Sequence, residues 1–216
     1  MTYKEQTIKK WKSWLEILRK EVHILLSHRL VFNETQQIIK DNLDIQKPSA
    51  FYNLLGQGYA ALIVLGIRRQ VKIDSKSISL AKLLAEISKQ PNLVTRQDYI
   101  KLYEGSKTSI FADKTFDKFA GTGKNEIDSV LVAKDLEQLR KAVRSCEHYA
   151  DRSLAHIDKR GSKKIPTFLE VNNALEILEK LIIRYELLLT AAGWTGLTPT
   201  FQYNWKSIFK YKWIDK

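Results

Sequence analysis

Apolar residues recur every three or four positions along most of the chain, which is the period of amphipathic α-helices. The first pattern predicts a helix from about Tyr3 to Arg29, with lysines on the face opposite to its apolar stripe. A shorter helix is expected from about Glu34 to Asn42, with Asn33 as its cap. The stripe of the first helix is interpreted as core and comprises Trp11, Trp14, Leu15, Leu18, Val22, Leu25 and Leu26.

A long apolar run follows Pro48 and predicts a helix from about Ser49 to Gln70. Several of its residues have small side chains, which would let another helix approach closely, so it is expected to be the central helix of a bundle. These residues are Gly56, Gly58, Ala60 and Ala61. The length of the run approaches that of a membrane span, but polar residues and glycines interrupt it, which favours a buried core helix.

Two capping signals predict the helices that follow. Ser77 or Ser79 is expected to cap an amphipathic helix that stops before Pro91. Thr95 and Asp98 have the spacing of a capping box and predict a short helix after it.

Periodicity is lost in residues 105–126, which are expected to form a loop insertion attached to the bundle by three phenylalanines, Phe111, Phe116 and Phe119. The sequence GTGK from Gly121 to Lys124 lacks the first glycine and the final Ser or Thr of a phosphate-binding P-loop. Nucleotide binding by such a loop is therefore not expected.

Two long helices complete the pattern. One begins near Ile127 or Val130 and runs to about Ile157. Thr167 and Glu170 form a second capping box, which opens the last long helix. No strand alternation appears in the sequence, so the fold class is predicted to be all-α: one domain, residues 1–216, built as a bundle of about six to seven helices.

The irregular C-terminal tail, residues 193–216, is rich in aromatic residues that alternate with lysines. Such residues can stack on unpaired bases and hold phosphates. They can also attach an irregular tail to the bundle, and this packing role is favoured because large apolar side chains are usually buried. The aromatic residues are Trp194, Phe201, Tyr203, Trp205, Phe209, Tyr211 and Trp213.

The formal net charge of +12 over 216 residues indicates an attraction to polyanions such as RNA, DNA or an anionic membrane. A solvated, lysine-rich surface would give the same charge. The single cysteine, Cys146, excludes an internal disulfide and a cysteine-based zinc cluster and fits a reducing cytoplasm. The N-terminal residues lack the apolar core of a secretory signal, so a cytoplasmic protein without membrane association is expected.

Titratable groups are densest from Ser145 to Lys164, in the sequence SCEHYADRSLAHIDKRGSKK. His148, Arg152 and His156 are four residues apart and would share one stripe of a continuous helix. Glu147 and Asp151 would lie on a neighbouring stripe. Three further candidate phosphate-binding residues follow, Asp158, Lys159 and Arg160.

This stretch could bind RNA and move a proton. Histidine exchanges protons near neutral pH, and arginine offers a planar fork for a phosphate. The 2′-hydroxyl of RNA supplies an internal nucleophile, so no metal or other cofactor is expected. His148 and His156 could instead be ordinary structural histidines. They would also lie roughly 12 Å apart on one helix, too far to contact one phosphate together.

The run YADRSLAHIDKR resembles the signature region of the HEPN superfamily, in particular its AbiU2-like branch. Further likeness lies in IRRQVKIDSKSISLAKLL, VTRQDYIKLY and LTPTFQYNWKSIF. The resemblance implies a helical bundle whose last two long helices frame a groove, commonly in a homodimer. It also implies RNA as the partner and, in many members, a metal-independent endoribonuclease of a phage-defence, abortive-infection or toxin–antitoxin system, with an antitoxin or defence partner.

The family motif has four to six residues between an arginine and a histidine. His156 matches the histidine and is expected to be the general acid or base, while Arg152, with only three residues between it and His156, does not match the motif arginine. Arg152 is nevertheless expected to bind the phosphate. Asp151 or Asp158 is expected to orient the imidazole. Arg68 or Arg69 could enter the groove from the central helix. The alternative is a non-catalytic dimeric interaction module with a degenerate motif.

Overall fold

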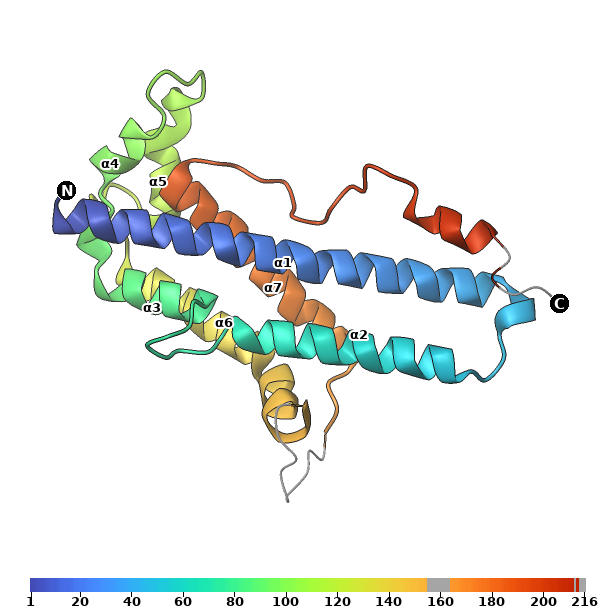
Figure 1. Ribbon diagram of the computed structural model, residues 1–216. Coiled ribbons are helices and arrows are strands. Elements are labelled where there is room, and N and C mark those ends of the chain that lie inside the picture. Colours follow the sequence, from blue (N-terminus) through green and yellow to red (C-terminus); the bar gives the residue numbers. More distant parts are fainter. Residues whose placement is uncertain (155–163, 212, 214–216) are drawn as a thin grey trace.

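The computed structural model describes residues 1–154, 164–211 and 213, which form an all-α bundle with no strand among them (Figure 1). The predicted fold class is confirmed. The α-helices are α1 (Tyr3–Asp41), α2 (Ala50–Arg69), α3 (Leu80–Lys89), α4 (Arg96–Lys101), α5 (Ala112–Ala120), α6 (Ser129–Tyr149) and α7 (Phe168–Thr190). Short 3-10 helices are η1 (Leu43–Ile45), η2 (Pro91–Leu93), η3 (Ser109–Phe111) and η5 (Trp205–Lys210), and η4 (Ala150–Leu154) is π-helical.

Helix α1 is continuous for 39 residues, so the predicted break before Glu34 is wrong. No proline or glycine lies between Arg29 and Glu34, and Phe32 continues the buried face of the helix. A helix with a continuous buried face and no breaker residue continues, as α1 does here. Asn33 could act as an N-cap only if a new helix began after it. The predicted core stripe is confirmed by Trp11, which is fully buried.

Helix α2 begins close to its predicted start and is capped by Ser49, but only its C-terminal half is buried. The expectation of a central helix is therefore wrong for its first half, where a Cβ atom added at Gly56 or Gly58 would meet nothing within 4 Å. The close approach lies at Gly66, where such a Cβ atom would be 2.3 Å from Cδ2 of Leu25. Among the described helices, α2 is the one long and apolar enough to span a membrane, by length and composition alone.

The expected loop insertion contains a helix, α5, which packs against α4. Phe116 and Phe119 are buried as expected, while Phe111 is exposed. The helix is only nine residues long, and its apolar positions are too few to establish a period in the sequence.

Helices α6 and α7 pack against each other, and α7 crosses α1 in the centre of the bundle (Figure 1). Both predicted capping boxes are present: Thr95 with Asp98 at α4, and Thr167 with Glu170 at α7. The residue in the left-handed conformation at the end of α7 is Ala191, with φ 59°.

The tail runs along the outside of α1 (Figure 1). The favoured packing role is wrong for much of it, because Tyr203, Tyr211 and Trp213 are 70%, 73% and 62% exposed. The rings pack mainly against each other: Trp205 contacts Phe209 edge-to-face, and Phe209 stacks on Trp213.

Candidate functional site

The predicted motif lies where the regular structure of α6 ends. After Tyr149 the chain passes into the π-helical turn η4, in which backbone hydrogen bonds span five residues and the turn is wider. The predicted straight stripe through His148 and Arg152 is therefore wrong, because it required an uninterrupted α-helix. π-turns recur at functional sites. His156, Asp158, Lys159 and Arg160 lie outside the described residues.

A cavity of about 440 Å³ lies between α6 and the first turns of α7. We call it the α6–α7 groove, and its lining residues are Lys141, Ala142, Arg144, Ser145, His148, Lys164, Glu170 and Asn173. The predicted phosphate-binding residue His148 is thus part of a lined groove. Lys141 and Arg144 were missed in the sequence, although their spacing to His148 places all three on one helix face.

Glu170, the acidic residue that lines the α6–α7 groove, already has partners within the chain. Oε1 of Glu170 lies 2.8 Å from Nζ of Lys164, and its other oxygen accepts a hydrogen bond from the backbone N–H of Thr167 at 2.9 Å. These donors lower the pKa of Glu170 to about 2, so it is ionised at neutral pH. Lys141, Arg144 and His148 make no ion pair or hydrogen bond with side chains elsewhere in the described part of the chain. The groove therefore presents the cations Lys141 and Arg144, which no described residue neutralises.

Two arginines predicted to bind phosphate are engaged elsewhere. Nε of Arg68 donates to a carboxylate oxygen of Asp151, an ion pair that connects α2 to the π-turn. Arg69 pairs with Glu21 of α1, with an N–O distance of 3.0 Å. Arg152 is half-buried and forms no ion pair with any described residue. Arg68 thus shapes the turn, and Arg152 is the member of this set that remains available.

The thiol of Cys146 is also part of α6 but faces the core. It is fully buried, and this burial raises its pKa to about 11. A buried, protonated thiol is neither a nucleophile nor a metal ligand. Within the described ranges, no group of three or more His, Cys, Asp or Glu side chains is arranged to hold a metal ion.

An α-helical bundle with a cationic groove between its last two long helices is the architecture expected of a HEPN-type domain. A family model described as AbiU2 matches residues 8–204, and the chain belongs to this HEPN family. Neither a curated protein nor a solved structure matches the chain.

Proposed function

We propose that this protein binds RNA in the α6–α7 groove. The observation that carries the proposal is a group of three cationic or titratable side chains, Lys141, Arg144 and His148, around a cavity of about 440 Å³. None of the three forms an ion pair with another described residue. A phosphate placed there would gain charge-assisted hydrogen bonds without breaking an existing ion pair. Membership of the AbiU2 family supports a role in abortive infection or a related defence system.

The proposal includes a homodimer, because a large apolar surface beside the groove is uncovered. Leu54 and Leu62 of α2 are 68% and 57% exposed, and Phe168 and Leu169 at the start of α7 are 63% and 79% exposed. The ring of Phe168 lies 6.5 Å from that of Tyr59, so the two helices contribute to one surface. Exposed apolar surface of this kind is typical of a protein interface. A second copy docked here would lie beside Glu170 of the groove.

Cleavage is the catalytic form of the proposal. The 2′-hydroxyl of RNA attacks the adjacent phosphorus, the bond to the 5′-oxygen breaks, and the products are a cyclic 2′,3′-phosphate and a 5′-hydroxyl. His156 takes the proton from the 2′-hydroxyl or gives one to the leaving oxygen. Arg152 stabilises the charge that develops on the phosphoryl oxygens. A cognate antitoxin or defence partner would regulate this activity in the cytoplasm.

Binding is tested by fluorescence anisotropy with labelled single-stranded RNA. Arg144→Ala should weaken binding about ten-fold, because it removes one charge-assisted phosphate contact. The two cationic contacts from Lys141 and Arg144 predict that affinity falls roughly seven-fold between 50 and 200 mM salt. Lys114→Ala is the matched control, since Lys114 is exposed on α5 and forms no ion pair with the described residues. Equal loss in both variants, or salt-independent binding, contradicts the proposed groove.

Cleavage is tested separately, with total RNA in EDTA. The wild type should cleave and His156→Ala should not, while both bind RNA equally. The second candidate function, a non-catalytic interaction module, is favoured by the short spacing between Arg152 and His156. It predicts RNA binding or dimer formation without cleavage in either protein.

A further inference from the structure

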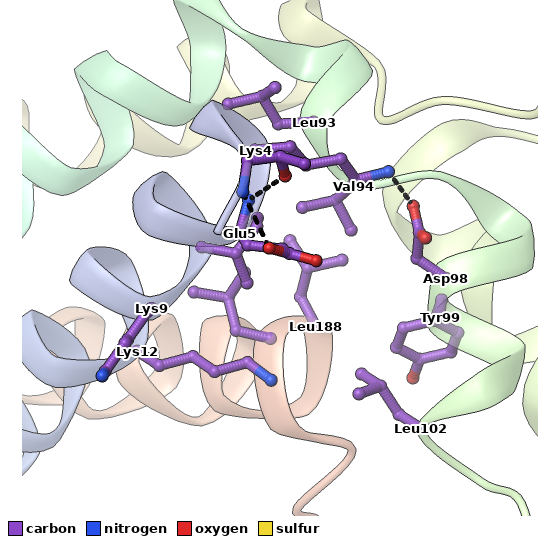
Figure 2. Close-up of a pocket in the computed structure, with 13 residues that line it drawn as sticks. Lys4, Glu5, Lys9, Lys12, Leu93, Val94, Asp98, Tyr99, Leu102 and Leu188 are labelled. Atoms are coloured by element: carbon purple, nitrogen blue, oxygen red, sulfur yellow. Dashed lines mark hydrogen bonds and ion pairs between the residues drawn. The ribbon is translucent and has the colours of Figure 1, made fainter.

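A second cavity, larger than the α6–α7 groove, lies at the other end of the bundle. Its volume is about 590 Å³, and we call it the N-terminal pocket (Figure 2). Its walls come from the first turns of α1, from the segment 93–102 and from the end of α7. This volume falls in the range of about 300–1,000 Å³ that is typical of small-molecule sites.

The inner surface of the N-terminal pocket is apolar. Its seven apolar lining residues are Ile8, Leu93, Val94, Tyr99, Leu102, Leu188 and Leu189. The hydroxyl of Tyr99 lies 3.0 Å from that of Tyr103 and is engaged with it, and burial raises the pKa of Tyr99, so the phenol stays neutral. Water in this pocket has few polar partners, and an apolar group that displaces it is favoured.

Most polar side chains at the rim of the N-terminal pocket form ion pairs or hydrogen bonds with one another. Nζ of Lys4 lies 2.5 Å from a carboxylate oxygen of Asp98. Glu5 and Thr2 form the capping box of α1, with the Thr2 N–H donating to Glu5 at 2.8 Å (Figure 2). The rim therefore contributes one balanced ion pair and a satisfied helix start, and these groups already have partners.

Lys9 and Lys12 are different, because they form no ion pair or hydrogen bond with the described residues. They are three positions apart on α1, so their stems lie on one side of the pocket. Lys12 is half-buried, which makes an unpaired ammonium there less favourable than on the open surface. The lining carries three lysines and two acids, a formal net charge of +1, and Lys9 and Lys12 are its cations without an ion pair to a described residue.

We propose that the N-terminal pocket binds an amphipathic anion, a small aliphatic or aromatic body that carries one carboxylate, sulfonate or phosphate group. The body would occupy the surface formed by Leu102, Leu188 and Leu189, and the anionic group would lie between the ammonium groups of Lys9 and Lys12. This assignment is independent of RNA binding in the α6–α7 groove, because the two cavities share no lining residue.

Calorimetric titration with decanoate, compared with decanol and decyltrimethylammonium, tests the charge requirement. The wild type should bind decanoate most tightly and the cation least. Lys9→Met/Lys12→Met keeps the apolar stems and should weaken decanoate binding about ten-fold while leaving decanol unchanged. Lys40→Met/Lys47→Met removes the same charge near the far end of α1, roughly 45 Å away, and should have no effect.

A third variant tests the pocket itself. Leu102 is 39% exposed, so Leu102→Trp can fill the cavity without replacing a core residue, and it should abolish binding of both decanoate and decanol. Circular dichroism confirms its fold, and RNA affinity should be unchanged. The proposal is overturned if decanoate does not bind, if both double variants lose affinity equally, if Leu102→Trp binds normally, or if anionic phospholipid vesicles bind while free decanoate does not.

Discussion

Arg96 at the start of α4 and Arg144 near the end of α6 are both helical arginines, yet the fold uses them in opposite ways. The guanidinium of Arg96 lies 2.9 Å from Oδ1 of Asp113 and 2.6 Å from Oδ1 of Asp117, and it donates to the carbonyl oxygen of Lys124 at 2.9 Å. Its side chain is only 13% exposed. Arg144 is exposed and has no such partner in the described part of the protein.

The difference distinguishes a structural cation from one available to a ligand. Arg96 connects α4 to α5 and to the turn at Gly121, and its guanidinium also lies 5.0 Å from the ring centroid of Phe116. Every donor it offers is used inside the chain. Lys141 and Arg144 of the α6–α7 groove make no ion pair or hydrogen bond with the side chains of described residues, although both regions contain carboxylates. A binding site is therefore identified by whether each charged side chain has a partner within the chain, and not by charge density alone.

The largest expected effect is on stability. Arg96→Ala should lower the free energy of unfolding by about 2–3 kcal/mol, because it leaves two carboxylates and several carbonyl oxygens without their donor. Urea unfolding followed by circular dichroism measures this loss. RNA affinity of the folded variant should stay unchanged, and a selective loss of RNA binding would show that Arg96 is not purely structural.

The reverse behaviour is expected at Arg144. Arg144→Ala should change the free energy of unfolding by less than about 0.5 kcal/mol, since an exposed side chain without partners contributes little to stability. The same variant should lose about ten-fold in RNA affinity. Urea unfolding and anisotropy on one preparation give both values. Strong destabilisation of this variant would mean that Arg144 has a structural role like that of Arg96.

Arg68 and Asp151 form an intermediate case, an ion pair at the border of the site. Their side chains are 28% and 46% exposed, so solvent screens the pair. A double-mutant cycle with Arg68→Ala and Asp151→Ala should give a coupling of about 0.5–1 kcal/mol in unfolding free energy. Zero coupling would mean that Arg68 is available to a ligand despite its position.

The smallest effect concerns pH and Glu170. Its folded pKa of about 2 is below the ordinary value of 4.5, so its stabilising contribution is present above pH 4.5 and is lost as pH falls towards 2. The difference in thermal midpoint between the wild type and Glu170→Gln should therefore be largest near neutral pH and should narrow below pH 4.5. A difference that stays constant from pH 7 to pH 3 would mean that protonation of this carboxylate does not control the start of α7.

Helix starts were the most predictable part of the structure. Ser79, Thr95 and Thr167 all cap helices as their sequence context indicated. A capping side chain bonds to the backbone two or three residues ahead, so the signal is complete within one turn. Helix ends and continuity were less predictable. The sequence predicted a break in α1 that does not exist, and a loop where α5 forms. Both differences depend on which apolar residues contact each other in the folded chain.

The site was predictable in part. The sequence singled out His148, but it extended the helix to about Ile157, whereas α6 ends at Tyr149. It also did not reveal that Arg68 pairs with Asp151, 83 residues away. It could not reveal the π-turn, since no residue type between Ala150 and Leu154 requires one. Lys141 and Arg144 became visible only when the structure placed them in a groove without an ion pair to a described residue.

The sequence by itself determined the all-α class, the capped starts of the helices, the AbiU2 resemblance and the positive charge, because each depends on residue types and short spacings. The tertiary structure alone decided which charges are neutralised, which half of α2 is buried, and where cavities form. These properties depend on contacts between residues far apart in the chain. For this protein, that distinction separates the structural role of Arg96 from the ligand-binding role proposed for the groove.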